Sequence, residues 1–362
     1  MSLIKSIFKR KDEQIKSYSD FWNWFQENEK DFYNVVKRNK DIENNFFDKL
    51  SPKLNQLREG FFYLTGMYDT NTAELIITAD GNIKNFVFVE DIISSAPIIS
   101  GWKFTAHKPA DGKGFKISMD GYEFSTKNLH FYPNDNSNFP DEIDITFVYD
   151  DYNEDYYDTI INGVSIFLDN FLGELESVTT IDSLTVKEDG GKQKLVPIDK
   201  LKDYLIWRQK EFIEKYDGLR YDTENDIHSV LEAELKSGNS LVAVINTDLL
   251  NWDRKASHPW LLTITIKFDG EKRNGMPDDE TFKFLNEVED KIMLELKDYE
   301  GYLYIGRQTA NGEREIYFAC KDFRKPSKIV SQIQENYSNE IEINYNIYLD
   351  KYWQSLDRFI NN

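Results

Sequence analysis

The sequence predicts an α+β protein of two domains, the second with a ferredoxin-like order of elements. Its 362 residues exceed what one hydrophobic core usually serves. Segments of period two alternate with segments of helical period, and a charged, glycine-containing run at 187–194 interrupts this pattern. We therefore expect a flexible N-terminus at 1–17, an N-terminal α+β domain at 18–188, a linker at 189–197, and a C-terminal domain with preceding helices at 198–362.

The N-terminal domain is expected to begin with helices and to continue mainly as strands. Aromatic residues on one stripe predict a helix over 19–40 with Ser19 or Asp20 as its cap, and a second helix over 46–59 ends at Gly60. The other expected elements are strands at 61–67, 73–78, 101–107, 114–119, 122–125, 129–132, 143–149 and 178–186, a short helix at 89–95, and a long helix at 154–172 followed by Gly173.

The second half is expected to open with charged helices at 199–216 and 224–236 and a strand at 240–246. Two local patterns fix the order that follows. Pro277 and the acidic residues after it favour a helix start, and Asn311-Gly312 is a strong hairpin turn. The expected elements are a strand at 261–268, a helix at 278–297, a hairpin of 302–309 with 313–320, a helix at 327–337 and a strand at 341–348. This β-α-β-β-α-β order is ferredoxin-like, with both helices on one face of the sheet.

Alternation along these strands predicts which side chains meet the helices. The side chains expected toward the helices are Leu262, Ile264, Ile266, Leu303, Ile305, Ile316, Phe318, Ile341, Ile343 and Ile347. Those expected on the outer face are Thr263, Thr265, Tyr302, Tyr304, Glu315, Tyr317, Glu342, Asn344 and Asn346. Tyrosines on such a face are typical of sheets that stack RNA bases. Because two glutamates share the face, we interpret it as a packing surface against the first half of the chain.

Charge and composition narrow the class of protein. The net charge is −20 and both halves are acidic, which disfavours nucleic-acid binding and steers the protein toward basic partner surfaces. No apolar run is long enough to span a membrane, and residues 1–16 do not form a signal peptide. We expect a cytoplasmic protein. We interpret the N-terminal segment as a frayed end. The alternative is a short amphipathic turn that touches a membrane.

The sequence carries no motif for catalysis, for a cofactor or for a metal. Cys320 is the single cysteine, so no disulfide or cysteine metal cluster can form. The four histidines are dispersed, and no nucleophile elbow, Walker loop or dinucleotide fingerprint occurs. The acidic segment 141–158 has two interpretations, a calcium loop or a helix start capped by Asp151 or Asn153. We favour the helix start, and we name no catalytic, cofactor-binding or metal-binding residue.

Six residues are candidates for an interaction site. Arg307 and Arg314 lie near the hairpin tip, with Lys321 and Arg324 not far beyond. These cations are suited to binding a carboxylate or phosphate through bidentate hydrogen bonds, or to pairing with acids of the protein itself. The other candidates are Tyr302, Tyr304, Tyr317 and Trp353.

Several runs carry a resemblance to a known family. The runs PWLLTI (259–264), NGMPDD (274–279), GRQT (306–309), NGERE (311–315) and YLDKYW (348–353) resemble the bacterial domain of unknown function 695, over roughly 241–359. That family is similar in topology to the regulator of ribonuclease activity B, an acidic inhibitor that binds an endoribonuclease. The resemblance implies a ferredoxin-like domain and a regulatory binding role, with no catalytic residues. The runs at 74–81, 96–104 and 172–174 resemble uncharacterised bacterial proteins.

These observations lead us to expect a non-enzymatic, protein-binding or regulatory module of the bacterial cytoplasm. The alternative is an enzyme or small-ligand binder with a site in the groove between the halves, using carboxylates and the Arg307/Arg314 pair. It predicts a deep pocket with a strongly perturbed carboxylate. A third hypothesis attaches the chain to a membrane or secretion assembly through residues 1–16.

Overall fold

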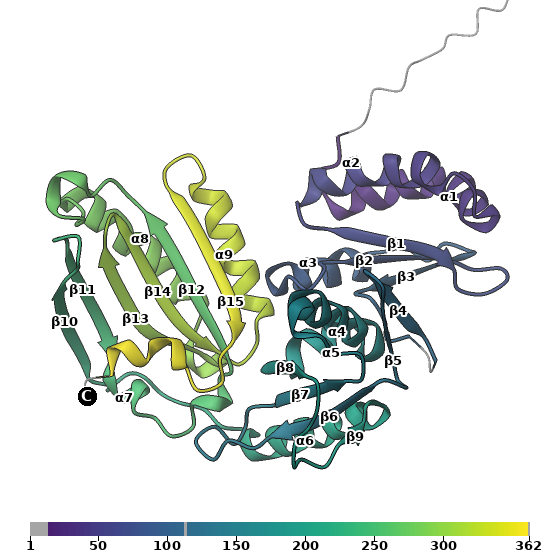
Figure 1. The fold of residues 1–362 in the computed structure, drawn as a ribbon. Coiled ribbons are helices and arrows are strands. Elements are labelled where there is room, and N and C mark those ends of the chain that lie inside the picture. The colour runs from purple at the N-terminus through teal and green to yellow at the C-terminus, as the bar shows by residue number, and fades with distance from the viewer. Residues whose placement is uncertain (1–13, 112–113, 361–362) are drawn as a thin grey trace, which may run out of the picture. The chain divides into compact units, whose positions relative to one another are not determined.

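The computed structural model describes residues 14–111 and 114–360 (Figure 1). The chain divides into two compact units, Met1–Pro109 and Ala110–Asn362. The predicted linker at 189–197 lies within the second unit, where β9 (Val196–Pro197) pairs with β6 (Leu129–Asn134). Most of the N-terminal segment for which membrane contact was considered lies outside the described residues.

The first unit contains a three-stranded sheet and an aromatic core. Its elements are α1 (Tyr18–Arg38), the π-helical turn η1 (Glu43–Phe47), α2 (Asp48–Leu57), β1 (Phe62–Met67), β2 (Ala73–Thr78), α3 (Ile83–Ser94) and β3 (Trp102–Ala106). The strand order is β1-β2-β3, with β3 parallel to β2. Ser17 caps α1, and Phe25 of that helix packs against Trp102 in a T-shaped arrangement at a ring separation of 5.0 Å. The helix expected at 89–95 begins earlier, because Asn82 accepts from the N–H of Lys84 and caps it.

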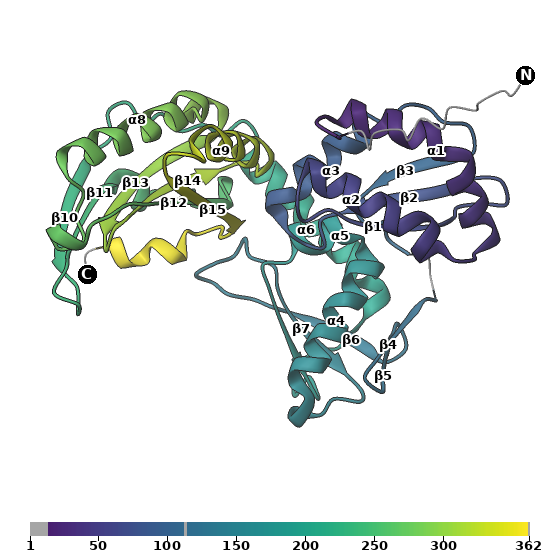
Figure 2. The same ribbon diagram turned by 90° about the horizontal axis from the view of Figure 1, so that it is seen from above.

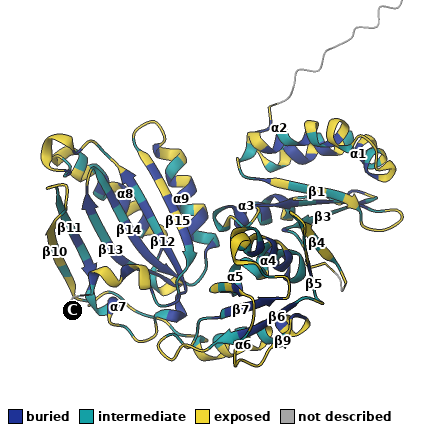
Figure 3. Cartoon of the chain, viewed as in Figure 1, coloured by how far each residue is buried: buried dark blue, intermediate teal, exposed yellow. Residues whose placement is uncertain are grey.

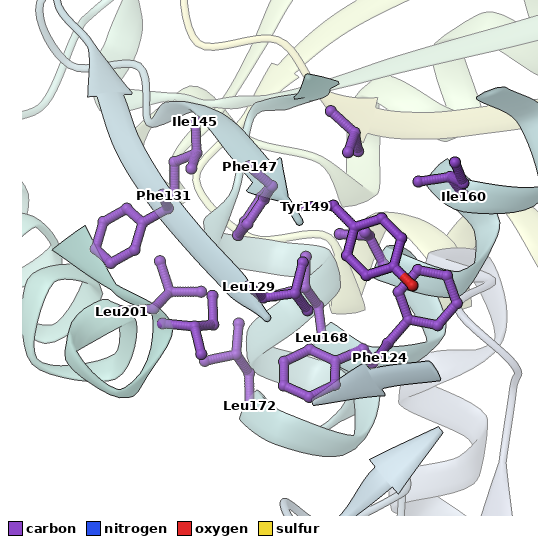
Figure 4. Packing of buried hydrophobic residues seen from close by; sticks show 14 of the residues in the cluster. Phe124, Leu129, Phe131, Ile145, Phe147, Tyr149, Ile160, Leu168, Leu172 and Leu201 are labelled. Carbon is purple, nitrogen blue, oxygen red and sulfur yellow. The ribbon is translucent and has the colours of Figure 1, made fainter. Parts of the chain in front are cut away.

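The first part of the second unit is a four-stranded mixed sheet of order β8-β7-β6-β9 beside a separate β4–β5 hairpin. Its further elements are β4 (Lys116–Met119), β5 (Tyr122–Ser125), β7 (Asp144–Tyr149), η2 (Glu154–Tyr156), α4 (Tyr157–Leu172), α5 (Glu174–Thr180), β8 (Ser183–Lys187), η3 (Ile198–Lys200) and α6 (Leu201–Tyr216). Side chains from these strands, from α4 and from Leu201 form one core (Figure 4). Gly163 of α4 is needed there, since a Cβ would lie 2.1 Å from the Phe124 ring.

The rest of the second unit is a six-stranded antiparallel sheet of order β10-β11-β13-β14-β12-β15. Its elements are β10 (His228–Glu234), β11 (Ser240–Asn246), α7 (Thr247–Leu250), η4 (Lys255–Ser257), β12 (Trp260–Lys267), η5 (Glu271–Arg273), α8 (Asp279–Glu295), η6 (Asp298–Glu300), β13 (Tyr302–Ala310), β14 (Glu313–Cys320), α9 (Arg324–Tyr337), β15 (Glu342–Leu349) and η7 (Gln354–Phe359). The segment from β12 to β15 has the predicted β-α-β-β-α-β order, and its strand order is that of the ferredoxin-like fold. The predicted fold class is confirmed.

Two predicted elements are wrong. The strand expected at 178–186 begins as a helix, α5, and becomes β8 only at Ser183. The helix expected at 224–236 is instead the edge strand β10, which pairs with β11 along its whole length (Figure 3). Ile227, Leu231 and Leu235 recur at helical spacing, but cross-strand pairing with β11 outweighs that local pattern.

The six-stranded sheet is covered on both faces. Helices α8 and α9 lie over one face, and η7 lies over the other (Figure 2). The second face has its own core, to which Leu303, Trp353 and Phe359 belong. The predicted orientation of β13 is therefore wrong. Tyr304 faces α8 and bonds to it, whereas Leu303 and Ile305 face the η7 side.

A bulge in β13 accompanies this arrangement. The pairing with β14 shifts between Tyr304 and Gly306. Gly306 has a φ of 149°, and a Cβ there would lie 2.3 Å from the carbonyl oxygen of Val244 on β11. Only glycine allows β11 to approach this closely.

Candidate binding groove

Three of the predicted candidates meet at a buried carboxylate on α8. Arg307 Nη1 donates to both carboxylate oxygens of Glu289 at 3.0 Å, and Arg314 Nη1 donates to Oε2 at 3.2 Å. The Tyr304 hydroxyl donates to Oε1 at 2.5 Å, and Asn286 accepts from Arg314 at 2.8 Å. The side chain of Arg314 is 1% exposed and that of Glu289 is 4% exposed. The two arginines therefore pair with an acid of the protein itself.

Electrostatics in this cluster follow from its burial. Burial lowers the pKa of Arg314, although the charge of Glu289 opposes that shift. Burial and the neighbouring Glu289 carboxylate raise the pKa of the Tyr304 hydroxyl. Glu289 was not singled out from the sequence. Its place on the inner stripe of α8, between Leu285 and Ile292, was the available signal.

The other three candidates are buried at separate places. Tyr302 lies on the helix side with Lys325 Nζ 5.4 Å from its ring centre. Tyr317 lies on the η7 side, where its hydroxyl donates to Glu315 at 2.7 Å and accepts from Arg358 at 2.9 Å. Trp353 donates from Nε1 to the carbonyl of His258 at 3.0 Å. The six candidates do not form one site.

A groove within the second unit brings together residues that are far apart in the sequence. Its volume is about 330 Å³. The lining residues are Asp141, Ile143, Thr179, Thr180, Arg208, Gln209, Phe212, Ile213, Pro259, Trp260, Lys321, Asp322, Phe323, Arg324, Leu349 and Lys351. They come from the β6–β7 loop, α5, α6, the start of β12, the β14–α9 connection and the end of β15. Apolar side chains form much of the surface, and four cationic side chains contribute to it.

A buried ion pair holds one wall of the groove. Lys351 Nζ donates to Asp182 Oδ2 at 2.6 Å and to the carbonyl of Asp141 at 2.9 Å. The same Asp182 oxygen accepts from the backbone N–H of Ile143 at 2.6 Å. Both charged side chains are less than a tenth exposed. Burial raises the pKa of Asp182 above its ordinary value, and the attraction of Lys351 only partly offsets this shift.

Asp141 is the second anchor of this wall. Its carboxylate accepts from Lys215 Nζ at 2.8 Å and from the hydroxyls of Tyr216 at 2.8 Å and Tyr352 at 2.7 Å. Burial alone would raise the pKa of Asp141, but these hydrogen bonds outweigh it and the pKa lies below the ordinary value. Asp141 is therefore a structural carboxylate that ties the β6–β7 loop to α6 and to the segment after β15.

Two cationic groups of the lining have uncharged hydrogen-bond partners. Arg208 donates to the hydroxyl of Tyr204 at 3.1 Å and to the carbonyls of Pro140 and Glu142 at 2.7 and 3.2 Å. Lys321 donates to the carbonyl of Leu219. Burial lowers the pKa of Lys321, and Arg220 adds to this shift.

The groove continues onto an exposed apolar ridge of α6. Ile213 lines the groove and is 65% exposed, while Ile206 and Trp207 are 55% and 53% exposed. Ile206 and Ile213 are two helical turns apart and so share one face of α6, spanning about 10 Å. Gln209 and Lys210 lie between these two isoleucines, so the ridge is a row of exposed apolar side chains interrupted by polar ones. Exposed apolar side chains beside a groove are typical of interaction sites.

Two other groups with reactive chemistry, Cys320 and His258, are withdrawn from solvent. Cys320 is fully buried, and burial raises the pKa of its thiol. His258 is buried, and burial lowers its pKa to about 3. Asn153 caps the turn that leads into α4, as the helix-start interpretation expects. Within residues 14–111 and 114–360, no group of three His, Cys, Asp or Glu side chains is arranged to hold a metal ion.

The family comparison matches the part of the chain that forms most of the six-stranded sheet. The second unit is an α+β structure whose C-terminal sheet contains a ferredoxin-like domain. Residues 236–360, from β11 to η7, match the family of unknown function DUF695, which confirms the resemblance inferred from the sequence. No curated protein and no solved structure matches the chain. Among the described residues, no helix combines the length and the apolar character needed to cross a bilayer.

Proposed function

We propose that this protein is a non-enzymatic binding module of the bacterial cytoplasm and that it binds a protein partner through the groove and the α6 ridge. The observation that carries the proposal is the continuity between the groove and exposed apolar side chains, through Ile213. A single enclosed pocket suits a small molecule. A groove that opens onto an apolar ridge presents more surface than a small molecule covers, which favours a protein.

The chemistry of the groove supports binding in place of catalysis. Asp141 and the Lys351–Asp182 pair are engaged in hydrogen bonds that join distant segments of the chain. Cys320 and His258 are buried and do not line the groove, and the Asp322 carboxylate of the lining is paired with Arg324.

Site-specific photocrosslinking in cells of the source organism tests the proposal. A benzophenone amino acid at Ile213 is expected to capture a defined partner protein. The matched control places the same group at Leu294 of α8, which is similarly exposed but lies outside the groove. The same adducts from both positions, or none from Ile213, would contradict the proposal.

A second candidate function is the binding of a small ligand or substrate in the groove. Two observations favour it: the groove volume falls at the lower end of the range of ligand pockets, ~300–1,000 Å³, and the pKa of the nearby Asp182 is raised by burial. The Arg307/Arg314 pair does not take part, because it is bound to Glu289. A thermal-shift screen of small carboxylates and phosphates tests this function, which predicts a rise in melting temperature that Ile213→Asn abolishes.

A further inference from the structure

The cationic part of the groove lining stands out in a chain of net charge −20. Arg208 and Lys321 both line the groove, and both donate hydrogen bonds to uncharged oxygens. Asp182 attracts Arg208 and Asp217 attracts Lys321 electrostatically, but the hydrogen bonds of both cations go to uncharged oxygens. A guanidinium binds a carboxylate more strongly than it binds a neutral carbonyl, because both partners are charged.

The apolar part of the lining lies next to these cations. Phe212 lies one helical turn after Arg208 on α6, on the same face, and also lines the groove. Trp260 and Leu349 pair across β12 and β15 and complete the apolar wall. A ligand that fills the groove thus meets apolar side chains and cationic groups. The carboxylates of Asp141 and Asp322 also line the groove, and they pair with Lys215 and Arg324.

We infer that the groove binds a segment of a protein partner in which a carboxylate lies beside an aliphatic or aromatic side chain. The carboxylate is held by Arg208 and Lys321, and the apolar side chain packs against Phe212, Trp260 and Leu349. This inference rests on the proposed binding function and adds the chemistry of the partner.

The net charge of the protein determines the kinetics of such binding. Long-range repulsion from the acidic surface slows the approach of an acidic segment, and salt screens this repulsion over a Debye length of ~10 Å at 0.1 M. The association rate is therefore expected to rise with salt between low and moderate ionic strength. A binding site driven by general attraction to an opposite charge would show the reverse.

Selection of random peptides displayed on phage, using the full chain as target, tests the inference. Recovered peptides are resynthesised with a fluorophore, and their affinity is measured by anisotropy. The variants are Arg208→Gln, Lys321→Gln and Ile213→Asn. Lys210→Gln is the matched control, since it removes an exposed charge from the same helix without touching the groove. Circular dichroism and melting temperature establish that each variant is folded.

The inference expects peptides that combine Asp or Glu with Leu, Ile, Phe or Trp. Their affinity should fall at least tenfold in Arg208→Gln and in Lys321→Gln, and less than twofold in Lys210→Gln. Peptides without acidic residues, or peptides that bind both charge variants normally but lose binding in Ile213→Asn, would overturn the acidic partner and leave the proposed function intact. Failure to recover peptides that depend on Ile213 would overturn both.

Discussion

Replacing Lys351 by methionine tests how much the buried Lys351–Asp182 ion pair at the wall of the groove contributes to stability. Methionine keeps most of the length and apolar volume of the lysine stem but removes the ammonium group. Asp182 then stays buried with one remaining hydrogen bond, from the N–H of Ile143. The carbonyl of Asp141 also loses its donor. Removal of one partner of a buried pair typically destabilises a protein by about 3–5 kcal/mol, because the remaining charge stays desolvated. We therefore expect the free energy of unfolding of Lys351→Met to be lower than that of the wild type by an amount in this range at pH 8.

The pH dependence distinguishes this cause from a simple packing defect. The folded-state pKa of Asp182 already lies above the ordinary value of 3.8 because of burial, and loss of Lys351 raises it further. A raised carboxyl pKa means that the folded state binds the proton more tightly than the unfolded chain, so stability falls as the pH rises through the folded pKa. The variant should therefore be closest to wild type near pH 4, and its deficit should grow toward pH 8.

Urea unfolding followed by circular dichroism and tryptophan fluorescence, at pH 4.5 and pH 8, measures this difference. The control is the double variant Asp182→Asn/Lys351→Met, which removes both charges. It should be less destabilised than Lys351→Met at pH 8, with a deficit that changes little with pH. Equal destabilisation of Lys351→Met at both pH values, or a double variant at least as unstable as the single one, would refute the reasoning.

Three further changes test other parts of the second unit by the same unfolding assay. Gly306→Ala places a Cβ against the Val244 carbonyl and should cost about 2–4 kcal/mol; a midpoint unchanged from wild type would show that β13 shifts freely. Glu289→Gln leaves two arginines without their counter-charge and should cost about 3 kcal/mol, whereas a neutral result would mean that the cluster is hydrated. Because burial holds the pKa of His258 at about 3 in the folded state, against 6.5 ordinarily, stability should decline as the pH falls from 6.5 toward 3. His258→Phe should reduce this decline in stability. If stability falls between pH 6.5 and pH 3 as steeply in the variant as in the wild type, His258 is not the cause of the decline.

Local patterns in the sequence were sufficient to predict the order of helices and strands in the ferredoxin-like core. α8 does begin among the acidic residues after Pro277, although Asp278 is the cap and not part of the first turn, and Asn311-Gly312 does join β13 to β14. These signals depend on neighbouring residues alone, so tertiary structure does not override them. The local pattern gave the wrong element for β10. The conformation of this strand depends on pairing with β11, and a helical pattern within one segment does not reveal that pairing.

The faces of β13 and the groove depend on contacts between distant segments. Alternation predicts one buried and one exposed face, but β13 is covered by α8 on one side and by the η7 core on the other. Arg208, Lys321 and Lys351 come from three separate elements, and no spacing in the sequence links them. Asp182, the acidic partner of Lys351, follows α5, where the sequence was interpreted as a strand. Residues of one hairpin, such as Arg307, could be grouped from the sequence because they are close along the chain. The residues of the groove are not, so the groove could not be predicted.

The position of β10 has a practical consequence for recombinant fragments. The segment shared with DUF695 begins at residue 236, after β10 has ended, although β10 is hydrogen-bonded to β11 along its length. A fragment trimmed to that segment would leave β11 as a newly exposed sheet edge, with Leu241, Val242 and Val244 in an unpaired strand. Such edges promote intermolecular strand addition and aggregation. Soluble expression of this domain alone should therefore require a start before His228.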